Sequence, residues 1–380
     1  MRFVYYYARS ISDPSGVTTA LWSWAGALAA AGHEVEVLHA GGPRRVAVPH
    51  TARLAESAIA HAGASRSTWY PLALGRHLRR GDVLVLHEGW VLSNLVAARA
   101  ARRVGVPYVV VPHGAYEPGV QRRLKPIVRV RRHLERQLLE RALAVHVFFP
   151  SEVATIGRLA ARARCIVAPT GQRIPAERWD GAGGYVAWLG RYDPGHKGLD
   201  ILLRGLASLP AASRPTLRLR GYDFQGGRRT VLGLTQELGL AEAVDVGGPL
   251  PGEEKLRFLQ HAAGYVHPSR WESHSIALLE SLALGVPTLA SASMHISAEL
   301  QAAKAAIVVE PTVAGVAAGL GELLDGGSGV GPRGRELIAE RFSWDHAVSS
   351  LLDGLEPLIE RRVVAGDVSD RPAGPARGAR

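Results

Sequence analysis

The chain has 380 residues, a length that predicts two domains of about 150–200 residues each. Its formal charge of +11 comes from 45 basic and 34 acidic residues, but only four of the basic residues are lysines, so we ascribe much of the charge to an arginine-rich coding bias and expect no nucleic-acid partner. The single cysteine, Cys165, excludes a disulfide framework and fits a reducing cytosol, and no apolar stretch reaches the ~20 residues of a membrane-spanning helix, so we expect a cytoplasmic protein.

Short apolar runs alternate with helical patterns through the first half of the chain. A strand expected at 3–7 is followed by a helix whose apolar residues recur at helical spacing from Val17 to Leu28, and which Gly32 ends. Strands that alternate with helices predict a parallel, doubly wound sheet, here in a first domain of residues 1–171. The further strands expected in this domain are 34–39, 83–87, 108–112 and 145–149.

A stretch rich in glycine, proline and charge, 172–184, predicts a linker between two domains. A second alternating series follows it and predicts a second doubly wound domain, 185–343. A last amphipathic helix is expected over 344–363, and the polar residues 364–380 predict a disordered tail. The strands expected in the second domain lie near 185–189, 217–221, 243–246, 264–267, 287–290 and 306–309.

Two glutamates, Glu272 and Glu280, stand eight positions apart after the strand expected at 264–267. The first lies in a polar loop, and the second lies in a helix that we expect to run from Ser275 to Leu284 and to end at Gly285. Free N–H groups at the start of such a helix attract anions, phosphate above all. The arrangement suits a ligand with both a phosphate and many hydroxyls, such as a sugar nucleotide; the alternative is an amphipathic helix with two surface glutamates.

This stretch resembles the Glu-x7-Glu motif of the retaining GT-B glycosyltransferases of family 4. Both glutamates match, and so does Gly285, whereas 273–275 read Ser-His-Ser where the family usually has Gly-Phe-Gly. The resemblance implies the GT-B fold, in which two Rossmann-like domains, each a doubly wound parallel sheet, face each other across a cleft, and the last helix crosses back to the first domain. It also implies that Glu272 binds hydroxyls of the donor sugar and that Glu280 binds the ribose of the nucleotide. The resemblance further implies that backbone N–H groups bind the sugar or the phosphate; these are the N–H groups of Ser273, His274, Ser275 and Ile276.

A second stretch, 190–200 (GRYDPGHKGLD), follows the first strand expected in the second domain and resembles the family's G-R-x-x-x-x-K-G-x-D sequence. The resemblance implies that Gly190 lies beside the donor and that Arg191 and Lys197 hold its diphosphate. Two fixed cations would stabilise the charge that develops on the distal phosphate as the nucleoside diphosphate leaves. A lysine at this position stands out because the chain has only four. The alternative is a solvated turn with incidental charges.

Weaker resemblances involve loops at the ends of other expected strands. Gly16, Gly221 and His113 occupy positions that the family places near the donor, and His113 is implied to lie beside the donor sugar; each is also compatible with an ordinary turn. His87 and Glu88 lie at a similar strand end, and we interpret them as contacts to the acceptor.

The basic segment 122–141 is expected to be an amphipathic helix, with Ile127, Val130, Leu134 and Leu138 on one face. One interpretation is contact with an anionic membrane or a lipid-linked acceptor, which would place the protein on the inner face of the cell membrane. The other, which we favour, is a helix that packs on the sheet of the first domain and exposes a basic face.

Several motifs of metal and cofactor sites are absent, among them Asp-x-Asp, paired C-x-x-C and H-E-x-x-H, so we expect neither a metal nor a cofactor. We predict a retaining, metal-independent glycosyltransferase that moves a sugar from a nucleotide-diphosphate sugar, with UDP favoured, to a hydroxyl of a glycan, a lipid-linked glycan or a small molecule, in the synthesis of surface polysaccharide or glycoconjugates. The alternatives are a GT-B sugar-nucleotide epimerase or phosphorylase, an enzyme that glycosylates a secondary metabolite and, more remotely, a protein that binds anionic polymers.

Overall fold

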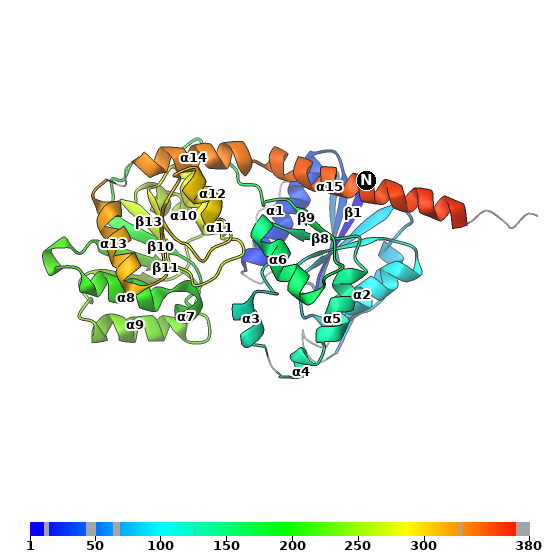
Figure 1. Ribbon diagram of the computed structural model, residues 1–380, viewed down its shortest axis with the longest axis horizontal. Helices are drawn as coiled ribbons and strands as arrows, with labels where there is room; N and C mark the ends of the chain where they lie inside the picture. The colour runs from blue at the N-terminus through cyan, green and yellow to red at the C-terminus, as the bar shows by residue number, and fades with distance from the viewer. Residues whose placement is uncertain (11–14, 43–50, 64–68, 125, 327–328, 370–380) are drawn as a thin grey trace, which may run out of the picture.

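The computed structural model describes residues 1–10, 15–42, 51–63, 69–124, 126–326 and 329–369, and it contains two parallel β-sheets, one in each half of the chain. Helices cover both faces of each sheet, and buried apolar clusters fill the space between the helices and the sheets (Figure 1). The prediction of two doubly wound parallel-sheet domains is confirmed.

The sheet of the first domain has the strand order β3-β2-β1-β6-β7-β8-β9, with every neighbouring pair parallel. Strand β1 (Arg2–Tyr7) lies near its centre. Phe3, Tyr5 and Tyr7 enter one apolar cluster, and Val4 and Tyr6 enter the cluster on the opposite face. Because both faces are buried, the strand is a continuous apolar run. The other strands of this sheet are β2 (Glu34–His39), β3 (Leu54–Ala58), β6 (Asp82–His87), β7 (Tyr108–Val111), β8 (Ala144–Val147) and β9 (Cys165–Val167).

Helix α1 (Gly16–Ala30) follows β1 and begins after Ser15, whose hydroxyl accepts a hydrogen bond from the N–H of Thr18 at 3.2 Å. This is the usual N-cap contact, and it satisfies one of the free N–H groups of the first turn. The remaining elements of the first domain are β4 (His61–Ala62), β5 (Tyr70–Pro71), the 3-10 helix Leu74–His77, α2 (Leu92–Arg103), α3 (Pro118–Arg122), α4 (Pro126–Arg129), α5 (Arg132–Glu140) and α6 (Pro150–Leu159).

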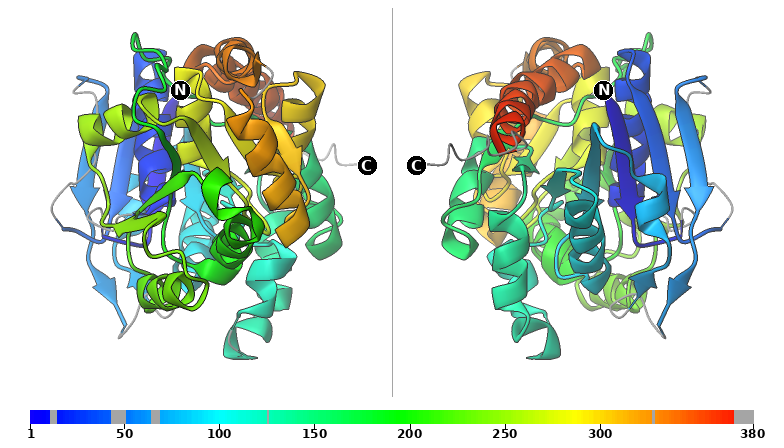
Figure 2. Two further views of the ribbon diagram at one scale, coloured as in Figure 1. Left: turned by 90° about the vertical axis from the view of Figure 1, so that its left-hand side faces the viewer. Right: turned by 90° about the vertical axis from the view of Figure 1, so that its right-hand side faces the viewer.

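The prediction of a single amphipathic helix over 122–141 is wrong. The segment comprises the end of α3 and the two helices α4 and α5, because a proline at the start of α4 has no N–H with which to continue a helix from the preceding turn. Val130 is 75% exposed and Leu134 is 45% exposed, whereas Leu138 is buried, so the predicted apolar face does not form; the side chain of Ile127 lies outside the described residues. Helices α3 and α4 lie on the side of the molecule opposite α15 (Figures 1 and 2).

The sheet of the second domain has the order β12-β11-β10-β13-β14-β15, again with every pair parallel. Its strands are β10 (Tyr185–Leu189), β11 (Thr216–Arg220), β12 (Val244–Gly247), β13 (Gly264–His267), β14 (Thr288–Ser291) and β15 (Ile307–Val309). Its helices are α7 (Pro194–Lys197), α8 (Leu199–Ser208), the 3-10 helix Ala211–Ser213, α9 (Gly227–Glu237), α10 (Gly252–Gln260), α11 (Ile276–Leu284), α12 (Ser297–Ala302), α13 (Val313–Leu324) and α14 (Val330–Arg341).

The chain crosses between the domains twice, and the two crossings lie side by side. The N–H of Gln172, on the way out, donates to the carbonyl of Phe342, on the way back, at 2.6 Å. The ring of Trp344, at the start of α15 (Trp344–Ser369), packs against Gly171 and meets Trp24 edge-on at 5.4 Å. Helix α14 lies along the second domain and α15 along the first (Figure 1).

Helix α15 extends beyond residue 363, where we expected the last helix to end, and continues to Ser369. The rest of the predicted tail, 370–380, lies outside the described residues. None of the helices in the described ranges is both long and apolar enough to cross a membrane.

Candidate active site

The order of strands in the second sheet reverses at β10, because the chain adds β11 and β12 on one side of β10 and β13 to β15 on the other. In a doubly wound sheet, the connections leave such a point toward opposite faces and open a crevice at the carboxyl ends of the strands. Arg191 follows β10 and Glu272 follows β13, so the topology brings the two predicted donor-binding stretches to the same crevice.

The closest contact in this crevice joins Lys197, at the end of α7, to the carboxylate of Glu272. The approach of the two stretches depends on Gly198, which has a φ of 66° and whose missing side chain leaves room for the carbonyl oxygen of Pro268. The side chains of Lys197 and Glu272 are only 12% and 11% exposed. Burial by itself would raise the pKa of Glu272, but Lys197, together with His267, holds it well below its usual range. The carboxylate is therefore ionised at neutral pH.

Arg191 lies beside this pair with 44% of its side chain exposed. Its guanidinium lies over the ring of Phe224 at 4.5 Å and donates to Nδ1 of His196 at 3.0 Å. The His196 ring stacks on Trp271 and bonds its carbonyl through Nε2 at 2.8 Å. Burial lowers the pKa of His196 to about 4, so the ring is neutral and can accept from the arginine. Arg191 also lies 3.5 Å from the carboxylate of Asp193, so its neighbours orient it while part of its side chain stays exposed.

The loop of residues 271–275, called the donor loop below, leads from Glu272 into helix α11. Ser275 is the N-cap, and its hydroxyl accepts from the N–H of Leu278 at 3.4 Å. Gly285 ends the helix with a φ of 83°, a conformation that favours glycine. The predicted helix and both of its limits are confirmed to within one residue, and the start of α11 lies directly after Glu272.

Glu280, in the second turn of α11, has a different partner. Its Oε1 accepts from Lys255 of α10 at 2.5 Å, and its Oε2 is buried without a partner in the described residues. Sequence reasoning missed Lys255, although the scarcity of lysine that drew attention to Lys197 applies equally to it.

The first sheet presents its own predicted site residues at an equivalent place, since β1 lies between β2 and β6. His87 ends β6, and its Nδ1 shares a hydrogen bond of 2.9 Å with Nε2 of His113, which follows β7. Glu88 receives two hydrogen bonds from Arg9, which follows β1. Glu88 and His113 have φ values of 69° and 51°, a left-handed conformation that is costly for such residues and is common at functional sites.

A ring cluster joins the two domains at this point. His113, His146 and His274 each pack against Phe148, with ring centroids 5.4, 5.3 and 5.0 Å away. Burial lowers the pKa of His87 to about 3 and those of His146 and His274 to about 4. The neutral rings therefore line the place where the turn at His113 meets the donor loop. His146 was missed because it lies inside a strand rather than in a loop.

Further contacts bring the turn after β7 against the second domain. A Cβ on Gly114 would lie 2.7 Å from that of Ser273, and one on Gly119 would lie 2.6 Å from the ring of Trp271. Arg123 donates to Asp193 at 2.8 Å. The donor loop is thus packed directly on the first domain.

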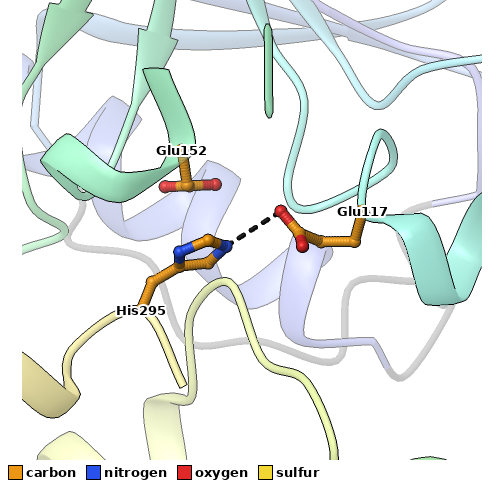
Figure 3. A group of neighbouring side chains, drawn as sticks. All are labelled: Glu117, Glu152 and His295. Atoms are coloured by element: carbon orange, nitrogen blue, oxygen red, sulfur yellow. Dashed lines mark hydrogen bonds and ion pairs between the residues drawn. The ribbon is translucent and has the colours of Figure 1, made fainter. Parts of the chain in front are cut away.

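Three more side chains from both domains meet beside the donor loop: Glu117 and Glu152 of the first domain and His295 of the second (Figure 3). Nε2 of His295 donates to Glu117 at 2.8 Å. One ligand atom from each residue lies within 4.8 Å of the others, a spacing that could hold a cation. These atoms are already engaged in hydrogen bonds within the protein, so we interpret the group as a set of contacts between domains.

Two predicted residues lie outside these contacts. Gly16 is exposed at the start of α1, with open space where its side chain would be. Gly221 packs against the carbonyl of Gly190, with no room for a side chain, so packing of the two loops explains its residue type. The roles that the sequence assigns to these and to the other site residues stay predictions.

Family models match both halves of the chain. Residues 15–171 match the glycosyl transferase 4-like domain, and residues 175–329 match the glycosyl transferases group 1. The chain belongs to the group 1 glycosyltransferases. The predictions of the family, of the GT-B fold and of a transferase are thereby confirmed.

Curated relatives of this glycosyltransferase include proteins named D-inositol 3-phosphate glycosyltransferase. The one from Acidothermus cellulolyticus is 31% identical over 191 residues, which are 47% of this chain and 42% of the relative. The one from Nocardia farcinica is 30% identical over 44% of this chain and 39% of the relative. The matched region is thus less than half the length of these relatives.

Solved structures of glycosyltransferases share the fold over nearly the whole chain. Sucrose-phosphate synthase from Thermosynechococcus elongatus superposes with a TM-score of 0.76 at 21% identity and covers 96% of this chain and all of its own. Anabaena HepE in complex with UDP and glucose superposes with a TM-score of 0.72 at 14% identity, with the same coverage. At these identities the likeness concerns the fold.

Proposed function

We propose that the protein transfers a sugar from a UDP-sugar to an acceptor hydroxyl with retention of configuration and without a metal. The observation that carries the proposal is the buried pair of Lys197 and Glu272 at the crevice of the second sheet, beside the accessible Arg191. Two cations after β10 and a carboxylate after β13 meet at one crevice, and they match the needs of a ligand with a diphosphate at one end and hydroxyls at the other.

The pair also suggests how the donor enters. Without a ligand, the attraction between Lys197 and Glu272 offsets the free-energy cost of burying the two charges. When the diphosphate binds, Lys197 turns to the phosphate, and Glu272 becomes free to accept hydrogen bonds from the sugar hydroxyls. Lys197 and Arg191 then stabilise the negative charge on the departing UDP, the part that a metal ion plays elsewhere. The phosphate of the leaving group takes the proton of the acceptor on the same face of the sugar, so the proposal requires no protein base.

The acceptor is proposed to lie on the first-domain side, near His87, Glu88 and His113. Its hydroxyl belongs to a glycan, a lipid-linked glycan or a small molecule. The names of the curated relatives make D-inositol 3-phosphate the first small acceptor to test. HepE, which shares the fold, has been solved with UDP and glucose, so UDP-glucose is the first donor to test.

The test compares Lys197→Ala and Glu272→Gln with the wild type in transfer from UDP-glucose to a panel of acceptors. Each change removes a group that stabilises the transition state, and we expect kcat/KM to fall by about 100-fold or more. Lys304→Ala removes a lysine from a surface turn of the same domain and should leave the rate unchanged. Full activity of Lys197→Ala, with the fold intact by circular dichroism, would refute the proposal, and loss of activity in EDTA would refute the absence of a metal.

We propose a cytoplasmic location, and peripheral contact with an anionic membrane through 122–141 is a separate proposal. Exposed Val130 and Leu134 lie among arginines there, a composition that favours an anionic lipid surface. Cosedimentation with phosphatidylglycerol vesicles, compared with phosphatidylcholine vesicles, tests it. Equal binding to both, or to neither, would contradict the contact.

A further inference from the structure

The donor loop is attached to the first domain on both sides of Glu272. On one side, the hydroxyl of Ser273 donates to Oε1 of Glu152 at 2.6 Å. On the other side, the backbone N–H of His295 donates to the carbonyl of Glu272 at 3.1 Å, and the imidazole ring of His295 forms hydrogen bonds with the first domain. The residue expected to bind the donor sugar therefore lies between two links that cross from one domain to the other.

The first link ends on a carboxylate whose orientation is fixed. Glu152 lies in the first turn of α6 and is 4% exposed. Its Oε2 accepts from the N–H groups of Phe148 and Phe149 at 2.8 and 3.1 Å. These bonds hold the carboxylate so that Oε1 points at Ser273, which is also buried. Burial raises the pKa of Glu152, and the hydrogen bonds from Ser273 and from the two backbone N–H groups counter that rise by favouring the carboxylate.

The second link uses both nitrogens of His295. Nε2 donates to Oε1 of Glu117 at 2.8 Å, and Nδ1 is hydrogen-bonded to the hydroxyl of Ser151 at 2.7 Å. Figure 3 shows the ring of His295 facing Glu117, with the carboxylate of Glu152 next to both. Glu117 and Ser151 belong to different segments of the first domain, so the ring has a fixed position only while the domains are together.

We propose that Glu152 and Glu117 are positioning residues that, through Ser273 and His295, hold Glu272 in place for the donor sugar when the two domains close. The hydrogen bonds of Ser273 and His295 to the first domain can form only when the domains are in contact. Domain closure and the positioning of Glu272 therefore occur together. The kinetic part of this inference rests on the proposed function, whereas its structural part does not.

The structural test measures the size of the ligand-free protein by small-angle X-ray scattering. The double variant Ser273→Ala/His295→Ala removes both links and leaves the bonds of Glu152 to its own domain intact. We expect a larger radius of gyration than in the wild type, and a return toward the wild-type value when His295→Gln replaces His295→Ala, because a glutamine amide can still donate to Glu117. The same profile for the double variant and the wild type would overturn the proposal.

The matched control is Ser281→Ala/His261→Ala, which removes a serine and a histidine from the same domain. Ser281 bonds the carbonyl of Leu278 within α11, and His261 bonds Asp180 of the linker, so neither reaches the first domain. This variant should have the wild-type radius of gyration. An equal expansion in the control would show a general loosening and would also overturn the proposal.

Turnover of UDP-glucose separates the inference from the proposed function. For Ser273→Ala we expect kcat to fall by about 10-fold or more while KM changes by less than about 3-fold, since the diphosphate contacts are untouched. An unchanged kcat in Ser273→Ala, alongside an inactive Lys197→Ala, would defeat the positioning role alone. Full activity of Lys197→Ala would defeat the proposed function, and the scattering result would still decide on the links.

Discussion

Each glutamate that the sequence assigns to the donor is paired with a lysine in the structure. Glu272 pairs with Lys197, and Glu280 pairs with Lys255. A partly buried carboxylate needs such a partner while the ligand is absent, because burial without one disfavours its charged form. Under the proposed function, Lys197 turns from Glu272 to the phosphate once the donor arrives, so the pair keeps both charges in the site until then.

Glu280→Ala should weaken the binding of UDP. We expect the dissociation constant to rise by about 10- to 100-fold, since a hydrogen bond to a charged group contributes about 1.5–3 kcal/mol. Titration calorimetry with UDP measures the change. Glu322→Ala, which alters an exposed glutamate of α13, serves as the control and should bind like the wild type. Wild-type affinity in Glu280→Ala would contradict the ribose contact.

The candidate site residues that could be predicted are those whose types and spacing match the motifs of the family. Lys197 and Glu272 could be named because their spacing from turns and helix ends matches a known pattern. Lys255, His196 and Glu152 could not, because each acts through a partner in a distant segment. Glu152, for example, is 121 positions from Ser273. Such pairs become visible only when the fold brings the segments together.

At the scale of the elements, most strands were predicted, the three-residue β15 among them, whereas β3 and β9 of the first sheet were missed. β3 has a largely exposed pattern and no apolar run, whereas β9 is apolar but short, with one of its three residues exposed. Both lie at edges of the first sheet, where one side has no neighbouring strand. The helical prediction over 122–141 is wrong because Pro126 interrupts the backbone hydrogen bonding that the hydrophobic spacing alone would allow.

Gly221→Ala tests how the strand ends support the site. A methyl group there would overlap the carbonyl of Gly190 and push apart the loops after β10 and β11. Such overpacking costs about 1–3 kcal/mol. We expect urea denaturation to show a loss of this size, together with weaker UDP binding.

The control for this change is Gly233→Ala in the middle of α9, where nothing lies within 4 Å of the added methyl group. Alanine favours a helix over glycine, so the free energy of unfolding should rise by about 0.5–1 kcal/mol. A Gly221→Ala protein as stable as the wild type would contradict the close packing of the two loops.

The whole molecule should lose stability as the pH falls below about 6.5, the ordinary pKa of histidine. Burial lowers the pKa of His87 to about 3 and those of His146 and His274 to about 4, and it lowers the pKa of His113 as well. Because the unfolded chain binds these protons first, each ring reduces the free energy of unfolding by up to about 1.4 kcal/mol per pH unit between its unfolded and folded pKa values.

Urea denaturation between pH 7.5 and 5 measures this loss. His295 works in the opposite direction: burial alone would lower its pKa, but Glu117 and Glu152 raise it, so its contribution is present at low pH and is lost as the pH rises through the raised value. The histidines with lowered pKa values outnumber His295, so we expect the free energy of unfolding to decrease as the pH falls. His274→Phe should reduce that slope, and an unchanged slope would contradict the neutral state of the ring.

The adjacent crossings at Gln172 and Phe342 also govern how the molecule can move. Two adjacent connecting segments form a hinge between the domains. We expect the domains to rotate about this hinge rather than to slide past each other. Helix α15 begins at this hinge, and α3 lies on the opposite side of the molecule (Figures 1 and 2). We therefore expect opening to displace the contacts of Arg123 and Trp271 farthest, so that a bulky acceptor would enter on that side.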